Sequence, residues 1–150
     1  MNKAEIELII KSALDELHCR DSLILEMDVN ERSISHKLAI YLEKFFDGWS
    51  VDCEYNRNHD HPKRLEFHAS NILSDDVFAR TVFPDIIVHK RHTDENLLVI
   101  EMKKSTSPVS KDFDLEKLNA FKIQLNYQFA VFIKIGIGAP VERYPIEWVD

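Results

Sequence analysis

Residues 82–104 read VFPDIIVHKRHTDENLLVIEMKK, and this stretch decides the fold. Two apolar runs, Val82 to Lys90 and Leu97 to Lys103, flank the polar segment RHTDEN. Short apolar runs bounded by turn-forming residues are typical of buried strands, and a connection this short predicts an antiparallel hairpin. The two strands of this hairpin are the starting point for the rest of the chain.

Two helices are predicted before the hairpin. Apolar residues at helical spacing indicate one at about residues 3–17 and another from Asn30, a favourable N-cap, to about Phe46. Asp47-Gly48 should end the second helix. Its apolar stripe consists of Ile34, Leu38, Tyr41, Leu42 and Phe45.

Extended segments account for much of the remaining chain. A strand from Trp49 to Tyr55, with its odd-numbered residues on one face, precedes a polar, irregular excursion at residues 56–80 with room for one short helix. After the hairpin, a helix capped by Ser110 or Asp112 leads to the apolar run YQFAVFIKIGIG, a strand covered on both faces. The final residues, RYPIEWVD, add a short edge strand.

This order of elements predicts a single α/β domain over residues 1–150, with a core at about 30–135 and an additional N-terminal helix. A content of 45% hydrophobic and 30% charged residues excludes wholesale disorder. The net charge of −7 argues against a nucleic-acid coat protein, which would need a broad basic surface. No apolar run approaches the roughly 20 residues that cross a bilayer.

The chain carries few signals of export. Its first residues interleave charged with apolar side chains, which is unlike a secretory or transit peptide. Cys19 and Cys53 are too few for a disulfide framework. We therefore expect a cytoplasmic protein with no membrane partner.

The register of the hairpin brings acidic residues together. Carboxylates on facing strands lie about 5 Å apart at Cβ and repel unless a proton or a cation lies between them. Mg²⁺ prefers such oxygen ligands. A turn about position 93 makes three facing pairs: Asp85 with Glu101, Ile87 with Val99, and His89 with Leu97.

Two short motifs occupy the ends of these strands. Pro84-Asp85 is the only Pro-Asp in the chain, and Glu101-Met102-Lys103 is the only Asp/Glu-x-Lys. Because residues two apart share a face of a strand, Glu101 and Lys103 point the same way. The lysine could therefore hold a water molecule beside a metal ion bound by the carboxylates.

A third carboxylate is expected at the same place. Glu31 lies three residues before Ile34 and seven before Leu38, so it extends the apolar stripe of its helix toward the sheet. A simpler role, stabilising the first helical turn through the macrodipole, stays open for this residue.

These motifs resemble the PD-(D/E)xK phosphodiesterase superfamily, which has the restriction-endonuclease-like fold. The resemblance covers about Asn30 to Ile135 and implies an αβββαβ core with a mixed sheet. The long excursion at 56–80 departs from the family pattern.

The resemblance also implies the chemistry. Asp85, Glu101, the Met102 carbonyl and Glu31 would bind Mg²⁺, with Mn²⁺ able to substitute, and Lys103 would position the attacking water. The protein would then be a metal-dependent nuclease acting on DNA, alone, as a homodimer or with a partner subunit. Arg57, Lys90 and Lys104 are candidates for a basic rim that contacts the nucleic acid.

Two other interpretations stay open. One is a non-catalytic relative that keeps the nuclease fold and binds nucleic acid or a protein partner. The other is a plain interaction module in which Glu101 and Lys103 form an incidental ion pair. The intact Lys103 argues against the first of these, because a decayed site has no reason to keep all its charges.

Overall fold

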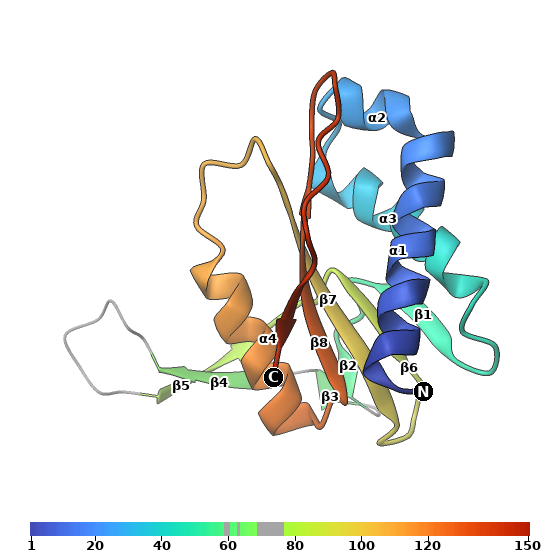
Figure 1. Cartoon of the computed structure of the whole chain (residues 1–150). Coiled ribbons are helices and arrows are strands. Elements are labelled where there is room, and N and C mark those ends of the chain that lie inside the picture. The colour runs from blue at the N-terminus through green and yellow to red at the C-terminus, as the bar shows by residue number, and fades with distance from the viewer. Residues whose placement is uncertain (59–60, 63, 69–76) are drawn as a thin grey trace.

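A computed structural model describes residues 1–58, 61–62, 64–68 and 77–150 (Figure 1). These residues form four helices, one five-stranded sheet and two short two-stranded sheets. The helices are α1 (Lys3–Arg20), α2 (Ser22–Glu26), α3 (Glu31–Glu43) and α4 (Asp112–Leu125). The strands of the main sheet are β1 (Ser50–Cys53), β6 (Ile86–His89), β7 (Asn96–Lys104), β8 (Phe129–Ile135) and β9 (Glu147–Val149).

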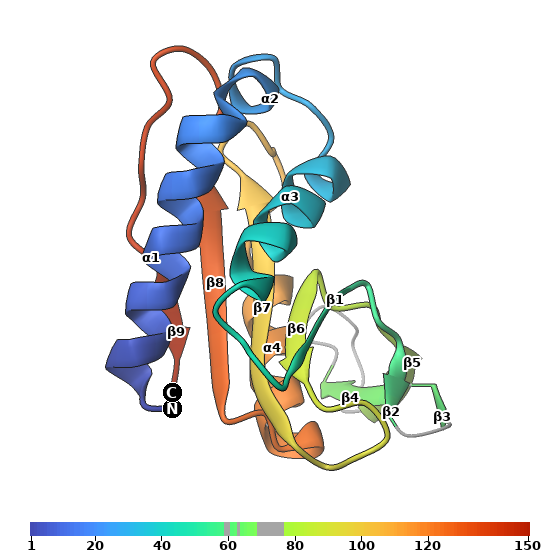
Figure 2. The same ribbon diagram turned by 90° about the vertical axis from the view of Figure 1, so that its right-hand side faces the viewer.

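The five strands form one mixed sheet in the order β1-β6-β7-β8-β9. Strand β7 pairs in parallel with β8, whereas the other neighbours are antiparallel. Figure 2 shows α1 and α3 in front of this sheet and α4 behind it. The predicted α/β class is therefore confirmed, with a central sheet between helical layers. None of the helices in the described part of the chain is both long and apolar enough to span a bilayer.

Alternating side chains of the sheet feed two separate cores. Ile86, Val88 and Ile100 pack toward α1 and α3, whereas Ile87 and Val99 pack toward α4. This alternation follows from the two-residue period of a strand. All four residues of β6 and the first seven of β7 are consequently buried, and a polar side chain on these strands has to find its partners inside the protein.

The hairpin register is the predicted one over most of its length. Ile87 pairs with Val99, as expected, and the neighbouring pairs keep the same register. The prediction was wrong at one pair, because an irregularity after Val88 places His89 opposite Asn96 instead of Leu97. His89 is buried there, with its Nε2 2.8 Å from Asp52 Oδ2.

Several predicted helix boundaries were wrong. Helix α1 continues to Arg20, and the short helix α2, which was not predicted, follows it. Asn30 caps α3 by accepting a hydrogen bond from the Ser33 amide, but the helix ends at Glu43, so Phe46 is buried and Phe45 is 42% exposed. The N-cap of α4 is Lys111, between the two predicted caps, and it makes no side-chain cap hydrogen bond.

The strand predictions also needed correction. Strand β1 ends at Cys53, and Glu54 has a positive φ of 50°, which reverses the alternation. Tyr55 therefore packs toward α4, whereas Trp49 packs toward α1 and α3. The strand predicted from Val82 begins only at Ile86.

The described part of the excursion at 56–80 contains strands, not a helix. They form two antiparallel pairs, β2 with β3 and β4 with β5. The Gln124 side chain of α4 makes two hydrogen bonds of 2.8 Å to the Glu66 backbone and so docks β4 on α4. Residues 59–60, 63 and 69–76 of this stretch lie outside the described residues. The four strands are β2 (Arg57–Asn58), β3 (His61–Pro62), β4 (Arg64–His68) and β5 (Val77–Thr81).

Candidate metal centre

Asp85 is held at the start of β6 by the neighbouring strand. Its Oδ2 accepts a hydrogen bond of 2.7 Å from the backbone amide of Met102 on β7. Pro84 has no amide hydrogen, so it cannot donate a backbone hydrogen bond that would extend the β6–β7 pairing. Just beyond that pairing, the Asp85 carboxylate accepts the hydrogen bond of the Met102 amide instead. The side chain of Asp85 is thereby fixed between the two residues, Glu101 and Lys103, that flank Met102.

Glu101 is the most deeply buried acid of the site. Its residue is 1% exposed, and its Oε2 lies 2.8 Å from Lys117 Nζ on α4. Among the described residues, the other oxygen, Oε1, has no hydrogen-bond partner. Buried carboxylate oxygens are nearly always hydrogen-bonded or bound to a cation, so an unpartnered one marks a place where a further ligand fits.

Burial shifts the protonation of both acids in the same direction. Desolvation raises the pKa of Asp85 to about 6, assisted by the charges of Glu31 and Asp114 and opposed by the Met102 amide and Lys117. Desolvation and the charge of Asp85 hold the pKa of Glu101 well above its usual range, although Lys117 opposes the shift. Raised pKa values in a pair of neighbouring acids are typical of functional sites.

Lys103 faces α4 from the end of β7. Its Nζ lies 2.9 Å from Asp114 Oδ2, and its side chain is 17% exposed. Desolvation lowers the pKa of Lys103, but the hydrogen bond to Asp114 and the charges of Glu31 and Asp85 outweigh it, so the net shift is upward. Lys103 is therefore a cation at neutral pH and acts as a hydrogen-bond donor rather than as a base.

Glu31 reaches the same end of the sheet from the opposite helical layer. It occupies the first turn of α3, and its Oε2 accepts a hydrogen bond of 3.3 Å from the backbone amide of Lys104. The charge of Glu31 raises the pKa of both Asp85 and Lys103. The structure thus brings Glu31 to the end of β7, where it acts on the other predicted site residues.

Two charged residues at this site were missed by the sequence analysis. Asp114 and Lys117 lie in the first two turns of α4 and contact Lys103 and Glu101, respectively. A usable signal was present, because Asp114 lies four residues before the buried Leu118, just as Glu31 precedes the stripe of α3. Extending the buried stripe of α4 toward its N-terminus would have found it.

The six charged side chains form a mutually interacting group. With every group ionised, four carboxylates against two ammonium groups leave a net charge of −2. No group of three or more His, Cys, Asp or Glu side chains in the described ranges is already arranged around a metal position, and lysines pair with Glu101 and Asp114. The unpartnered Glu101 Oε1 and the excess negative charge both fit one divalent cation. The group consists of Glu31, Asp85, Glu101, Lys103, Asp114 and Lys117.

The residues proposed for a basic rim do not form one group. Lys90 follows β6 at the hairpin end and pairs with Glu95 at 2.7 Å. Lys104 ends β7 at the carboxylate end of the sheet and pairs with Asp28 at 2.8 Å. The structure therefore places Lys90 and Lys104 at opposite ends of the hairpin, and Arg57 lies exposed in β2.

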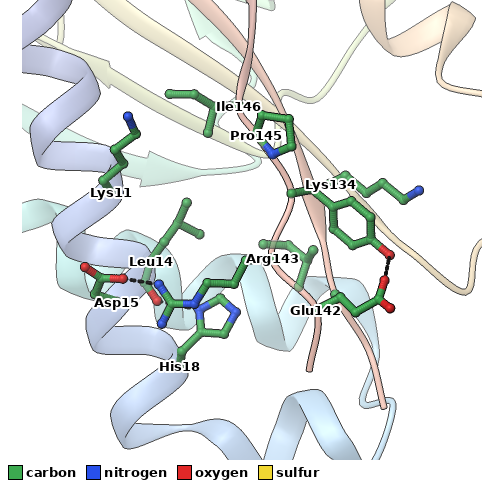
Figure 3. A pocket seen from close by; sticks show the side chains of 12 residues that line it. Lys11, Leu14, Asp15, His18, Lys134, Glu142, Arg143, Pro145 and Ile146 are labelled. Carbon is green, nitrogen blue, oxygen red and sulfur yellow. Dashed lines mark hydrogen bonds and ion pairs between the residues drawn. The ribbon is translucent and has the colours of Figure 1, made fainter. Parts of the chain in front are cut away.

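A cavity of about 280 Å³ lies elsewhere, between α1 and residues 134–146 (Figure 3). Several of its charged groups already have partners within the chain. Arg143 forms an ion pair with Asp15, and the Tyr144 hydroxyl donates to Glu142 at 2.8 Å. These contacts give the cavity a structural explanation, and it contains none of the predicted site residues.

Comparison with known proteins gives no match: no family model, curated protein or solved structure is significantly similar to this chain. The case for a function therefore depends on the geometry of the site itself.

Asp85→Asn should stabilise the metal-free protein at neutral pH. The pKa of Asp85 rises from 3.8 to about 6 on folding, so the folded state favours the protonated acid and stability falls as the pH rises through this window. Asparagine can still accept from the Met102 amide but carries no charge. Urea unfolding in EDTA should show a gain approaching about 3 kcal/mol at about pH 8 and none below about pH 4. A gain that does not change with pH would contradict the assigned cause.

Proposed function

We propose that this protein is a Mg²⁺-dependent nuclease that hydrolyses DNA phosphodiester bonds, with the restriction-endonuclease-like fold of the PD-(D/E)xK superfamily. The observation that carries the proposal is the buried, unpartnered Oε1 of Glu101 beside Asp85, two acids with raised pKa values at one sheet end. A pair of acids buried this way lowers stability, and a metal-binding role accounts for their retention.

The arrangement of elements supports the same superfamily. Helix α3, strands β1, β6 and β7, helix α4 and strand β8 follow one another in the αβββαβ order, apart from the β2–β5 excursion after β1. The sheet is mixed, with β7 and β8 parallel and connected through α4. Pro84-Asp85 immediately precedes β6, and Glu101-Met102-Lys103 lies on the adjacent strand β7, a placement that agrees with the family motif.

The acidic residues would hold the metal from three elements. Asp85 at the start of β6 and Glu101 on β7 are the principal ligands, with the Met102 carbonyl and Glu31 of α3 completing the set. When bound there, Mg²⁺ would supply Lewis-acid chemistry toward a phosphoryl oxygen and the attacking water. The Met102 amide keeps Asp85 oriented, so no rearrangement of β6 is needed for it to serve as a ligand.

Lys103 would act on the nucleophile and the phosphate. As a cation fixed by Asp114, it can donate a hydrogen bond that orients the attacking water and offset the negative charge that develops at phosphorus. Asp114 would then be a positioning residue. Lys117 neutralises Glu101 in the metal-free protein and would release it as a metal ligand.

One observation favours a second candidate, a non-catalytic module with the same fold. The Lys117–Glu101 and Lys103–Asp114 ion pairs already offset the charges of two acids without any metal. A module of this kind would bind nucleic acid or a protein partner and would show no stabilisation by Mg²⁺ or Mn²⁺. Cleavage assays with Mn²⁺ on linear, branched and single-stranded DNA separate the two candidates directly.

Divalent metal should stabilise the parent protein through Asp85 and Glu101. A ligand that binds only the folded state adds about 2.7 kcal/mol at a concentration of 100 times its dissociation constant. Asp85→Asn and Glu101→Gln should each abolish the rise in melting temperature that Mn²⁺ causes. Undiminished Mn²⁺ binding by both variants in calorimetry would show that the metal site is misassigned.

Lys103→Ala should separate metal binding from catalysis. Because Lys103 acts on water and not on the metal, we expect metal affinity within a few-fold of the parent and a cleavage rate lower by about 10²-fold or more. The rate is measured under single-turnover conditions with saturating metal. Cleavage by this variant at the parent rate would remove Lys103 from the mechanism.

Glu31→Gln tests whether the helix contributes to the centre. The substitution keeps the size of the side chain and its ability to accept from the Lys104 amide, but removes the charge. A metal-site role predicts weaker metal binding and slower cleavage with little change in metal-free stability. A macrodipole role predicts only a loss of about 0.3–1 kcal/mol in stability, with metal affinity unchanged.

A further inference from the structure

A smaller cavity, of about 180 Å³, lies at the ends of β7 and β8, next to the six-residue charged group described above. Its walls come from the end of β7, the loop that leads to α4, and β8. Lys103 lines this cavity and is also a member of the six-residue charged group, so the two are directly adjacent. The lining consists of Lys103, Lys104, Ser105, Ser107, Val109, Lys111, Phe132 and Lys134.

Every charged side chain that lines this cavity is a lysine. This is unexpected in a protein with a net charge of −7. Three of the lysines have acidic partners, and none of those partners lines the cavity. The lining of the cavity therefore carries four lysines and no carboxylate. The pairs are Lys103 with Asp114, Lys104 with Asp28, and Lys111 with Glu147.

Lys134 differs from the other three. In the part of the chain that the structure describes, it forms no ion pair with a carboxylate, and its Nζ lies 4.3 Å from the centroid of the Tyr144 ring. The Lys111 ammonium likewise lies 5.7 Å from the centroid of the Phe132 ring. Aromatic faces hold these ammonium groups in place without neutralising their charge.

We propose that this lysine cavity binds a backbone phosphate of the nucleic acid. This phosphate would be next, along the same DNA strand, to the phosphate held at the six-residue charged group. The inference rests on the proposed function and specifies how the substrate is held. Ammonium groups and serine hydroxyls are the donors that phosphate oxygens accept in protein–DNA complexes. The apolar wall made by Val109 and Phe132 suits the sugar between two phosphates.

The existing ion pairs do not prevent this binding. The Lys111–Glu147 pair is almost half exposed on both sides, and exposed pairs contribute only about 0–1 kcal/mol. A phosphate can therefore displace or share Glu147 at Lys111, while Lys134 has no carboxylate to give up among the described residues and Lys103 stays paired with Asp114. The metal site and this cavity would together fix two points of one strand, which orients the bond to be cleaved.

The double variant Lys111→Gln with Lys134→Gln tests the cavity without changing a proposed catalytic residue. Binding of a labelled DNA oligonucleotide is measured by fluorescence anisotropy in EDTA, over a series of salt concentrations. We expect affinity about tenfold lower at low salt, and a salt dependence reduced by about 1–2 in the slope of log K against log salt. Cleavage at subsaturating DNA should fall in parallel, while Mn²⁺ stabilisation stays at the parent value.

The double variant Lys3→Gln with Lys44→Gln is the matched control, because it also removes two lysine charges that lie over aromatic rings, on residues that do not line the cavity. If this control weakens binding as much as the cavity double variant, attraction is diffuse and the inference is overturned. An oligonucleotide with uncharged methylphosphonate linkages should bind the parent and the double variant equally. If the double variant weakens only inorganic phosphate binding and not DNA binding, the cavity is a small-anion site and the inference is also overturned.

The test separates this inference from the proposed function. If the parent cleaves DNA and the double variant binds and cleaves like the parent, the cavity has no role in DNA binding, although the nuclease assignment stands. If the parent does not cleave DNA but the lysine-dependent binding is present, the cavity assignment stands and the nuclease assignment fails.

Discussion

The hydrogen bond from the Met102 amide to the Asp85 carboxylate connects the two strands of the hairpin at the candidate site and places Asp85 next to the other charged residues there. It fixes the side chain of Asp85 against β7 at the point where the β6–β7 ladder ends. Because β7 alternates its side chains, a carboxylate bound at the Met102 amide lies between Glu101 and Lys103. The same strand then continues to Lys104, whose amide binds Glu31 from the other helical layer. The helical layer that contains α3 is thus connected to the same short length of β7 that binds Asp85.

The burial of these charges requires both cores to be in place. Ile87 and Val99 cover the face toward α4, and Ile86 and Ile100 cover the face toward α3. Water is therefore excluded around Glu101, and desolvation is the largest cause of the upward pKa shift in both Asp85 and Glu101. The apolar sheet that stabilises the fold is also what makes the acids unusual, because the same carboxylates in water would titrate normally.

The sequence was most informative where short-range rules apply. Strand periodicity predicted the Ile87–Val99 register, and the N-cap rule placed the start of α3 at Asn30, so the neighbourhood of Asp85, Glu101 and Lys103 was foreseeable. The β-pairs between residues 57 and 81 were not foreseeable; β4, for example, docks on α4 through Gln124, a contact between residues far apart in the sequence. Lys117 was missed for a related reason: its role depends on how α4 lies over β7, which no local pattern specifies.

The Lys117–Glu101 ion pair has a consequence for the order in which folding and metal binding would occur. A core that contained only acids would need a cation before it could close, and folding would wait for metal. Here the chain supplies its own cations, so the sheet can close first. If a divalent ion binds as proposed, it would take the place of the Lys117 ammonium at Glu101, and that ammonium would become available to an incoming anion. Loading of the centre and the preparation of a positively charged surface beside it would be one and the same step.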